Sequence, residues 1–479
     1  MIFVFILNFS WIFMQSFYHN SFEGLNSESV EFLNSLLLFL SQYTTVSLNF
    51  FSIDKVSNLF ILLTTLLTPF SLLSNWSSIV IFNSKKLFYS LLIWIEIMLL
   101  IIFSTEDLFI FYLGFEGLSI PVFFLIFLYG AEVTKLRASI YFLVYSFISS
   151  TCMAFAIFLL FSQTQALNIN CLKDYFSKNL LFYNVTNNYT SSNLIVNWVH
   201  TFITLERLNL IWLFLFLGFI IKLPLMPFHM WLPEAHAEAP TSGSIMLTGV
   251  ILKLGGYGLF KFFIPLFGSY QYFLPLLHTL CIIGIIYICL VCLKTNHIKQ
   301  IIAYSSIVHM NGVCLGLFTN KLISVTGSIY AMLSHSLISS SLFFLAGILY
   351  NRYGSYYIEN YSGLFYNMPY FSFYFICLIL ANIATPLTSG FISELLILID
   401  LSKQNLFIFL IFAANYVLNT AYSIWLLNRI LFSDIKITLS SRNWVNYTDL
   451  IPLEIKALQL FFILIILFGI TPNLVLSII

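Results

Sequence analysis

The chain has 479 residues, of which 60% are hydrophobic and only 8% are charged, and its formal net charge is +1. Soluble domains carry about 25% charged residues, so this chain has too few charges to cover itself with a surface that faces water. That excludes a soluble globular enzyme and a disordered tail, and the small net charge gives no basic footprint for nucleic acid. The apolar residues instead come in runs of about 20, the length that crosses a bilayer.

Apolar runs between polar or Pro/Gly breaks predict an all-α polytopic membrane protein with about fourteen transmembrane helices. A β-barrel is excluded, because its strands would alternate apolar and polar residues. The first run lacks a basic leader and a small-residue cleavage site, which favours a retained helix over a signal peptide. In chain order the spans are expected near 1–17, 33–51, 57–80, 87–104, 107–129, 138–161, 208–228, 241–264, 272–293, 299–318, 324–349, 369–398, 404–432 and 457–476.

The chain also shows a doubled organisation. Pro224 and Pro227 interrupt the span at 208–228, Pro386 interrupts the span at 369–398, and each of these spans is the fourth in a block of five. Interrupted helices at matching places in two halves are typical of inverted-repeat transporters. The predicted units are three helices over 1–86, a first repeat over 87–264 with a polar loop at 162–207, a second repeat over 265–432, and a loop and last helix over 433–479.

Basic residues are distributed unequally between the loops of the two sides. An excess of Lys and Arg marks the matrix or cytoplasmic side of a membrane protein, so the richer side is predicted to face inward and both termini to face outward. Six basic residues lie on the poorer side, and the richer side carries Lys85, Lys86, Lys135, Arg137, Lys294, Lys299, Arg352, Lys436, Arg442 and Lys456.

Two ionisable residues lie inside spans of the first block. An ionisable side chain at the bilayer centre costs roughly 2.5–3.5 kcal/mol even on a lenient insertion scale, so each needs a function or a partner. Glu116 lies mid-span in LGFEGLSIP, and Lys222 lies at the proline break in FIIKLPLMPF. They are expected to form an intramembrane ion pair, and the alternative is a static pair that only fixes packing.

Four more lie in the last span of the first block and in the second block. Lys253 lies in GVILKLGGYG with no acidic residue within a helical turn, while Lys261 is nearer the helix end and is expected to extend its ammonium group to the membrane surface. His309 and His335 lie mid-span, and imidazole exchanges protons near neutral pH. Glu394 follows the second break. In helix order Glu116, Lys222, Lys253, His309, His335 and Glu394 predict a path for protons.

The sequence provides no energy source for such a path. It contains no Walker A motif, no GxGxxG and no ligand set for flavin, haem or an iron–sulfur cluster. Moving one elementary charge against 100 mV costs about 2.3 kcal/mol. We therefore expect no cofactor or metal in this chain, and we expect partner subunits to drive any proton movement.

Four stretches carry a family resemblance. IKLPLMPFHMWLPEAHAEAPTSGSIMLTGVILKLGGYG (221–258) resembles the signature of the antiporter-like subunits of NADH:ubiquinone oxidoreductase, respiratory complex I, and in particular the chain 4 family. STEDLFIFYLGFEGLSIP (104–121), IKQIIAYSSIVHMNGV (298–313) and SIYAMLSHSLISSSLFFLAG (328–347) match it too. An acid at 394 favours chain 4, since the chain 2 and chain 5 relatives usually have Lys there. The long 162–207 loop, Glu96 and Glu234 depart from the pattern.

The resemblance implies fourteen helices in inverted five-helix repeats and a hydrated axis onto which the six intramembrane residues map. It implies that FMN, iron–sulfur clusters and ubiquinone are held by partner subunits. Chains 2 and 5, accessory subunits and lipids such as cardiolipin are the implied neighbours in the mitochondrial inner membrane, with the termini on the intermembrane-space side. The alternatives are a cation/proton antiporter subunit, a plastid homologue, or a structural membrane-arm subunit with no proton path of its own.

Overall fold

The computed structural model describes residues 51–75, 84–131, 134–176, 194–267, 273–433 and 448–479. In these ranges the chain forms helices and a few isolated β-bridges, as the composition predicts. Ten helices are long and apolar enough to cross a membrane. The predicted spans at 1–17 and 33–51 fall outside the described residues, apart from residue 51.

The first half of the chain contains most of the helices that form one side of the bundle. In order they are α3 (Lys55–Ser74), α4 (Lys85–Ser104), α5 (Leu108–Gly117), α6 (Ser119–Tyr129), α7 (Lys135–Thr164), α9 (Leu194–Lys222), α10 (Trp231–Glu238), α11 (Thr241–Met246), η2 (Leu247–Ile251), α12 (Leu252–Gly258), η3 (Leu259–Phe263) and α13 (Ile264–Phe267). The segments from α11 to α13 form one continuous crossing, Thr241–Phe267. Helix α9 begins at Leu194, so part of the predicted 162–207 loop is helical.

The second half forms the other side. Its elements are α14 (Leu274–Lys294), α15 (Ile298–Phe318), α16 (Leu322–Tyr353), η4 (Ile358–Asn360), α17 (Leu364–Asn367), α18 (Pro369–Asn382), α19 (Ser389–Gln404), α20 (Leu406–Leu427), η5 (Asn428–Phe432), α21 (Pro452–Ile470) and α22 (Asn473–Leu476).

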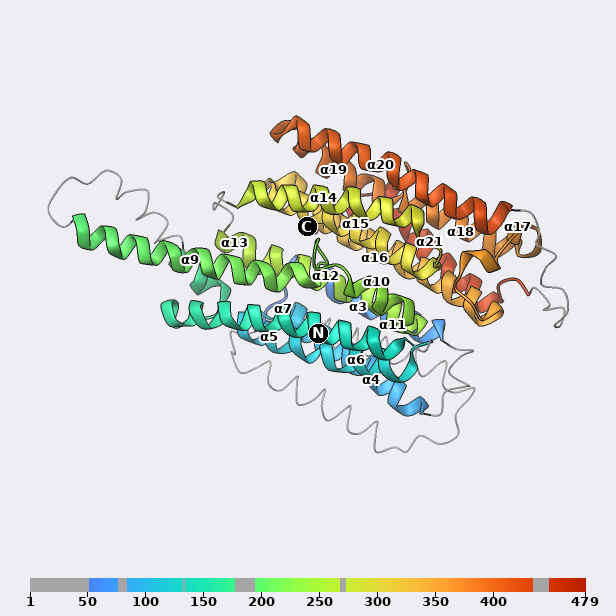
Figure 1. Cartoon of the computed structure of the whole chain (residues 1–479), viewed down its shortest axis with the longest axis horizontal. Coiled ribbons are helices and arrows are strands. Elements are labelled where there is room, and N and C mark those ends of the chain that lie inside the picture. The colour runs from blue at the N-terminus through green and yellow to red at the C-terminus, as the bar shows by residue number, and fades with distance from the viewer. Residues whose placement is uncertain (1–50, 76–83, 132–133, 177–193, 268–272, 434–447) are drawn as a thin grey trace.

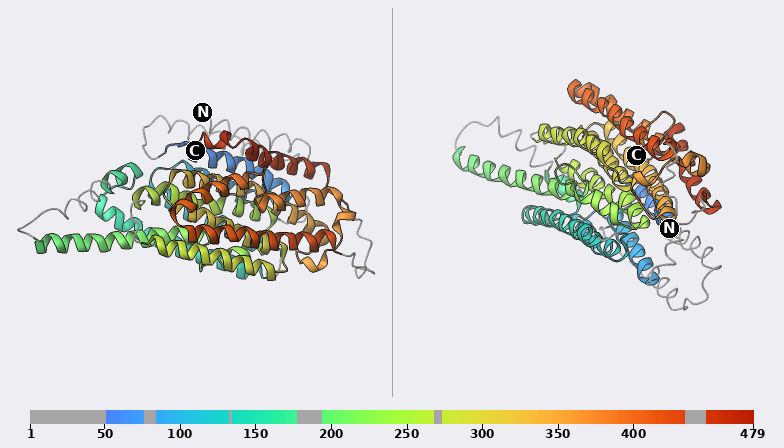
Figure 2. Two further views of the ribbon diagram at one scale, coloured as in Figure 1. Left: turned by 90° about the horizontal axis from the view of Figure 1, so that it is seen from above. Right: turned by 45° about the vertical axis from the view of Figure 1, so that its right-hand side comes forward.

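The long helices run side by side, and helices α15 and α16 lie at the centre of the bundle. The first half occupies the lower part of Figure 1 and the second half the upper part, and Figure 2 shows the same bundle from two other directions. The most apolar stretch of α16 is 100% buried and that of α15 is 89% buried, against 39% for α7 and 33% for α20. Ionisable groups on α15 and α16 are therefore kept away from lipid.

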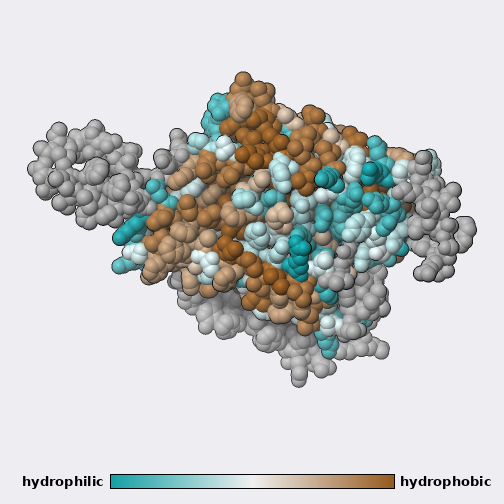
Figure 3. Space-filling view, viewed as in Figure 1, coloured by the Kyte–Doolittle hydropathy of each residue, from teal (hydrophilic) through white to brown (hydrophobic). Residues whose placement is uncertain are grey.

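The two ends of the bundle differ in polarity from its middle. One end of the bundle is formed by the first residues of α4, α7 and α15 and by the last residues of α14 and α16. We call this end the basic face, because it carries Lys85, Lys135, Lys294, Lys299 and Arg352. Hydrophobic side chains cover much of the bundle in Figure 3, and hydrophilic ones gather at its right-hand end, where Figure 1 places α17. This pattern is that of a protein embedded in a bilayer.

Both predicted helix breaks are present. Helix α9 ends at Lys222 and α10 begins at Trp231, while α18 ends at Asn382 and α19 begins at Ser389. A side chain satisfies a freed carbonyl at each break. Trp231 Nε1 donates to the Ile221 carbonyl at 2.9 Å, and Asn419 Nδ2 donates to the Asn382 carbonyl at 3.4 Å. Irregular backbone survives at membrane depth only where protein or water satisfies it.

Candidate functional site

The centre of the site is Lys253, whose position depends on an irregular helix. Lys253 is the second residue of α12, a short α-helical piece between the π-helical segments η2 and η3. π-Helical turns inside α-helices are frequent at functional sites. The Lys253 side chain is fully buried, and its ammonium group donates to the Thr248 carbonyl in η2.

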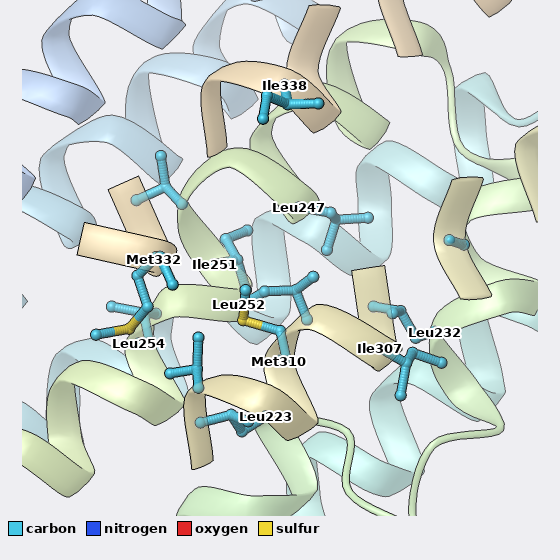
Figure 4. Close-up of a cluster of buried hydrophobic side chains, with 14 of the residues drawn as sticks. Leu223, Leu232, Leu247, Ile251, Leu252, Leu254, Ile307, Met310, Met332 and Ile338 are labelled. Atoms are coloured by element: carbon cyan, nitrogen blue, oxygen red, sulfur yellow. The ribbon is translucent and has the colours of Figure 1, made fainter. Parts of the chain in front are cut away.

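Apolar side chains on both sides of Lys253 insulate it. Leu252 and Leu254 lie beside Met310 of α15 and Met332 of α16, which Figure 4 shows pointing into one hydrophobic cluster. An added Cβ at Gly255 would lie 2.8 Å from Leu223 Cβ, so α12 and the end of α9 are in close contact. This is the close helix approach that small residues permit in membranes.

The Lys253 ammonium group makes a second contact, across the two halves of the chain. Its Nζ lies 2.9 Å from Nδ1 of His335 on α16. His335 is 5% exposed, and its ring centroid is 5.4 Å from that of His309 on α15. Lys253 of the first half therefore lies next to His335 of the second half, and His335 lies next to His309.

His309 continues the series to a carboxylate. Its Nδ1 lies 3.0 Å from Oε1 of Glu394 on α19, the helix that follows the second break. Four of the six residues singled out from the sequence, Lys253, His335, His309 and Glu394, thus form one uninterrupted row of proton-exchanging groups. Neighbouring members of this row are in hydrogen-bond or ring contact.

A small cavity opens beside the last two groups. The cavity is lined by His309, His335 and Glu394 together with Asn382 and Asn415. Its volume is about 30 Å³, and one water needs roughly 10–15 Å³ by the same measure. The polar lining and the volume suit about two waters. Water and imidazole together can carry a proton between groups that do not touch.

The expected ion pair between Glu116 and Lys222 is not formed. Within the described residues, no nitrogen–oxygen distance of 4 Å or less joins them. The Lys222 ammonium group instead lies 5.0 Å from the ring centroid of Phe115 and 5.1 Å from that of Phe142. The prediction failed because Glu116 and Phe115 are consecutive residues of α5 and therefore point in different directions, so that the ring and not the carboxylate meets Lys222.

Lys261 reaches toward one end of the bundle. Its side chain is only 6% exposed, and its ammonium group lies 3.4 Å from Oδ2 of the exposed Asp54, at the start of α3. It also lies 5.6 Å from the centroid of the Tyr257 ring. The pair ties η3 to α3 at the face opposite the basic face.

Two further intramembrane acids have structural contacts. Oε1 of Glu96 on α4 accepts a hydrogen bond from Thr68 of α3 at 3.1 Å. Oδ2 of Asp400 on α19 accepts from the backbone N–H of Ser324 at 2.8 Å, which caps the first turn of α16. Neither residue belongs to the row that ends at Glu394.

One residue was missed from the sequence. His236 on α10 is fully buried, and within the described parts of the chain neither of its ring nitrogens has a hydrogen-bond partner. Its ring stacks on Phe343 with centroids 4.9 Å apart, and it interacts electrostatically with Lys299 and Lys253. His236 is thus close enough to Lys299, on the basic face, and to Lys253, in the row, to interact with both. It was overlooked because it follows the break in α9 and belongs to no continuous apolar run.

Comparison with known proteins decides the family. The model of the NADH:quinone oxidoreductase/Mrp antiporter transmembrane family matches residues 105–419. NADH-ubiquinone oxidoreductase chain 4 of Acanthamoeba castellanii is 40% identical over 428 residues, which are 89% of this chain and 80% of the relative. The chain 4 protein of Chondrus crispus is 38% identical over 91% of this chain and 81% of its own length. The chain belongs to the NADH-ubiquinone oxidoreductase chain 4 family.

Solved structures share the fold of this chain 4 family member. A chain of respiratory complex I from Thermus thermophilus superposes with a TM-score of 0.73 at 24% identity, over 89% of this chain and 84% of that one. A chain of the Mrp complex from Dietzia also gives a TM-score of 0.73, at 16% identity and over 89% of this chain and 83% of that one. The overall bundle fold is therefore shared with chains of these membrane complexes.

Proposed function

We propose that this chain is a membrane-arm subunit of proton-pumping NADH:ubiquinone oxidoreductase and that protons move through the row Lys253–His335–His309–Glu394. The contacts within this row are the observation that carries the proposal. Amine, imidazole and carboxylate groups follow one another, with Lys253, His335 and His309 on the three most buried crossings and Glu394 on α19. A purely structural role would not require four such groups in sequence, because buried charges are costly to keep.

The ends of the row suggest how it exchanges protons with its surroundings. His236 interacts electrostatically with both Lys253 and Lys299, so we infer that it connects the row to the basic face, which the excess of Lys and Arg assigns to the matrix side. Lys222 ends α9, which packs against α12 at Gly255, and its ammonium group is held between two aromatic rings. We infer that Lys222 and Glu116 are the groups through which a neighbouring subunit influences the row.

Redox chemistry belongs to other subunits in this proposal. The sequence motifs that hold flavin, nucleotide or iron–sulfur clusters are not present in the chain. We infer that partners containing FMN, iron–sulfur clusters and ubiquinone provide the energy. The chain 2 and chain 5 subunits flank this one, and accessory subunits and cardiolipin cover its outer faces in the mitochondrial inner membrane. The termini lie on the intermembrane-space side.

Replacing Lys253 with Ala tests the proposal. The assembled complex in sealed vesicles should still oxidise NADH but should move fewer protons per electron, and replacing Glu116 with Ala should have the same direction of effect. If both variants assemble and pump at the normal proton-to-electron ratio, the chain is a structural subunit. The Mrp-like fold raises the alternative of cation exchange, and a proton movement that depends on an added sodium gradient would favour that alternative.

A further inference from the structure

Helix α16 begins without a capping side chain of its own. Its N-cap residue is Lys321, which makes no side-chain hydrogen bond to the first turn, because lysine has no acceptor for the free N–H groups at a helix start. Asp400 of α19 provides the acceptor instead. Its Oδ2 accepts from the backbone N–H of Ser324, the third residue of α16, at 2.8 Å. Asp400 is 2% exposed and Ser324 is fully buried, so the most buried helix of the bundle is capped from another helix.

The neighbouring end of α15 is capped from the same helix. Helix α15 ends at Phe318, and the carbonyl of its C-cap residue, Thr319, accepts a hydrogen bond from Nε2 of Gln404 at 3.0 Å. Asp400 and Gln404 are four residues apart, so both side chains leave the same face of α19. We call their two hydrogen bonds the α19 clamp. The clamp holds α19 at the turn that joins α15 to α16, residues 319–321.

Glycines let α19 lie close to both helices on either side of Glu394. A Cβ added to Gly327 of α16 would lie 3.2 Å from the Ser393 carbonyl oxygen, and one added to Gly316 of α15 would lie 3.0 Å from Cγ1 of Ile397. Small residues permit this close approach between helices in membranes. The glycines therefore set how near α19 lies to α15 and α16, and its position along them depends on other contacts.

No continuous helix holds α19 in place at either end. It follows the second break, at 383–388, and after Gln404 a single residue with extended backbone, Asn405, separates it from α20. The two hydrogen bonds of the clamp are therefore needed to fix where α19 lies along α15 and α16. Glu394 precedes Asp400 by six residues on this helix, about 9 Å along its axis. A shift at the clamp would move the Glu394 carboxylate with it.

The proton path is sensitive to such a shift. Oε1 of Glu394 lies 3.0 Å from Nδ1 of His309, and misplacing a reacting group by about 1 Å can slow a reaction on the order of 10²-fold. The three helices that the clamp joins are α15, α16 and α19, and they are the helices that carry His309, His335 and Glu394.

We propose that Asp400 and Gln404 are positioning residues of the proton path, and that the α19 clamp holds Glu394 in contact with His309. Both residues act through the placement of α19 and exchange no proton with the row. This inference rests on the proposed function, because it explains how one contact of that row is kept. It also gives a reason for the buried acid at position 400, since a carboxylate is costly to keep in so apolar a bundle.

Four substitutions in the assembled complex test the clamp. Asp400→Leu removes the acceptor, whereas Asp400→Asn keeps an oxygen that accepts from the Ser324 N–H. Gln404→Met removes the donor at similar side-chain length, and it keeps the test decisive if Asp400→Leu does not assemble, because Gln404 is exposed. Ser402→Ala is the matched control, since its exposed hydroxyl lies on the same turn and donates to the Ile399 carbonyl of its own helix.

The first readout is the distance between His309 Nδ1 and Glu394 Oε1 in cryo-electron microscopy maps of the complex, and the second is the proton-to-electron ratio in sealed vesicles. In Asp400→Leu the contact should open and this chain's share of the ratio should be lost, with NADH oxidation retained. Gln404→Met should change both readouts in the same direction but by less. Asp400→Asn and Ser402→Ala should match the unmodified complex.

A contact that stays closed, or a normal ratio, in both Asp400→Leu and Gln404→Met overturns the inference. A lower melting temperature alone would then mean that the clamp only stabilises the fold. Losses in Asp400→Asn or Ser402→Ala as large as in Asp400→Leu would also overturn it, because both variants keep the capping bond. If Lys253→Ala lowers the ratio in that same preparation, the proposed function stands while the positioning role fails. An unchanged ratio in both Lys253→Ala and Glu116→Ala would refute the proposed function itself.

Discussion

Lys253 and His335 join the two halves of the chain through a single contact of 2.9 Å between Nζ and Nδ1. Lys253 belongs to the irregular helix that crosses the first half, and His335 belongs to the most buried helix of the second. A proton on the lysine can therefore pass to the imidazole without crossing lipid or open water. The contact also means that protonating one group disfavours protonation of the other, because like charges repel strongly at this distance in a medium of low polarity.

The first prediction concerns His335. His335→Phe keeps a ring of similar size in the same buried site but removes both nitrogens, so Lys253 loses its only side-chain hydrogen-bond partner among the described residues. A positioned proton donor or acceptor contributes about 10²–10⁴-fold to proton transfer. Proton transfer through this chain should slow by a factor in that range, so this chain's share of the proton-to-electron ratio should be lost while NADH oxidation continues. The measurement is the proton-to-electron ratio in sealed vesicles.

Ser336→Ala is the control for this prediction. Ser336 is the next residue on α16, is fully buried, and donates only to the Leu333 carbonyl of its own helix. Its removal should leave the ratio unchanged. Equal losses in His335→Phe and Ser336→Ala would show that the effect comes from packing and not from the imidazole.

The second prediction tests whether Glu394 acts by accepting a hydrogen bond or by taking up and releasing a proton. Glu394→Gln retains an oxygen that can accept from Nδ1 of His309, so the 3.0 Å contact and the assembly of the complex should persist. The amide cannot take up and release a proton, so pumping should fall as it does for His335→Phe. Glu394→Asp retains the acid but shortens the side chain, and its pumping should be intermediate. A fully active Glu394→Gln would exclude this carboxylate from the path.

Composition and run length were enough to predict the fold class, and the prolines were enough to place both breaks. The identities of Lys253, His309, His335 and Glu394 were also visible, because an ionisable residue mid-span is conspicuous in so apolar a chain. Their contacts were not visible. Which helix faces which depends on packing between residues far apart in sequence, and 82 positions separate Lys253 from His335.

Glu116 and Lys222 show where the sequence argument fails. Opposite charges at similar depth favour an ion pair, but the direction of a side chain depends on the rotation of its helix. Phe115 and Glu116 are consecutive residues of α5, so the rotation of this helix about its axis decides which of them faces Lys222. In the structure the Phe115 ring faces it, and the Glu116 carboxylate does not. His236 shows the opposite error, since a search confined to continuous apolar runs passes over polar residues buried beside a broken helix.

The third prediction follows from this absence of a direct pair. The effects of Glu116→Gln and Lys222→Met on the thermal stability of the purified complex should be additive within about 0.5 kcal/mol, as for residues without a shared contact. The effects of Phe142→Leu and Lys222→Met should not be additive, because the Phe142 ring is 5.1 Å from the Lys222 ammonium group. A coupling energy for Glu116 and Lys222 as large as that for Phe142 and Lys222 would contradict the structure.

The fourth prediction concerns acid sensitivity at the basic face. His297 precedes α15, and its Nδ1 accepts from the backbone N–H of Gln300 at 3.4 Å, which caps the helix. Burial, with a smaller contribution from the nearby Lys299, lowers the pKa of His297 to about 4. Histidine in an unfolded chain has a pKa of about 6.5. As the pH falls below about 6.5, the unfolded chain therefore binds the proton and the native chain does not, so native stability decreases until the pH reaches about 4.

His297→Asn tests this, because asparagine can cap the helix but does not titrate. The melting temperature of the complex should fall less for the variant than for the unmodified protein when the pH is lowered from about 7.5 to about 5, with little difference between them above about pH 6.5. The proton-to-electron ratio should be unaffected, since His297 is outside the row that ends at Glu394. An identical acid dependence in both proteins would mean that His297 is protonated as readily in the native state as in the unfolded chain, and that its capping bond is not made by a neutral ring.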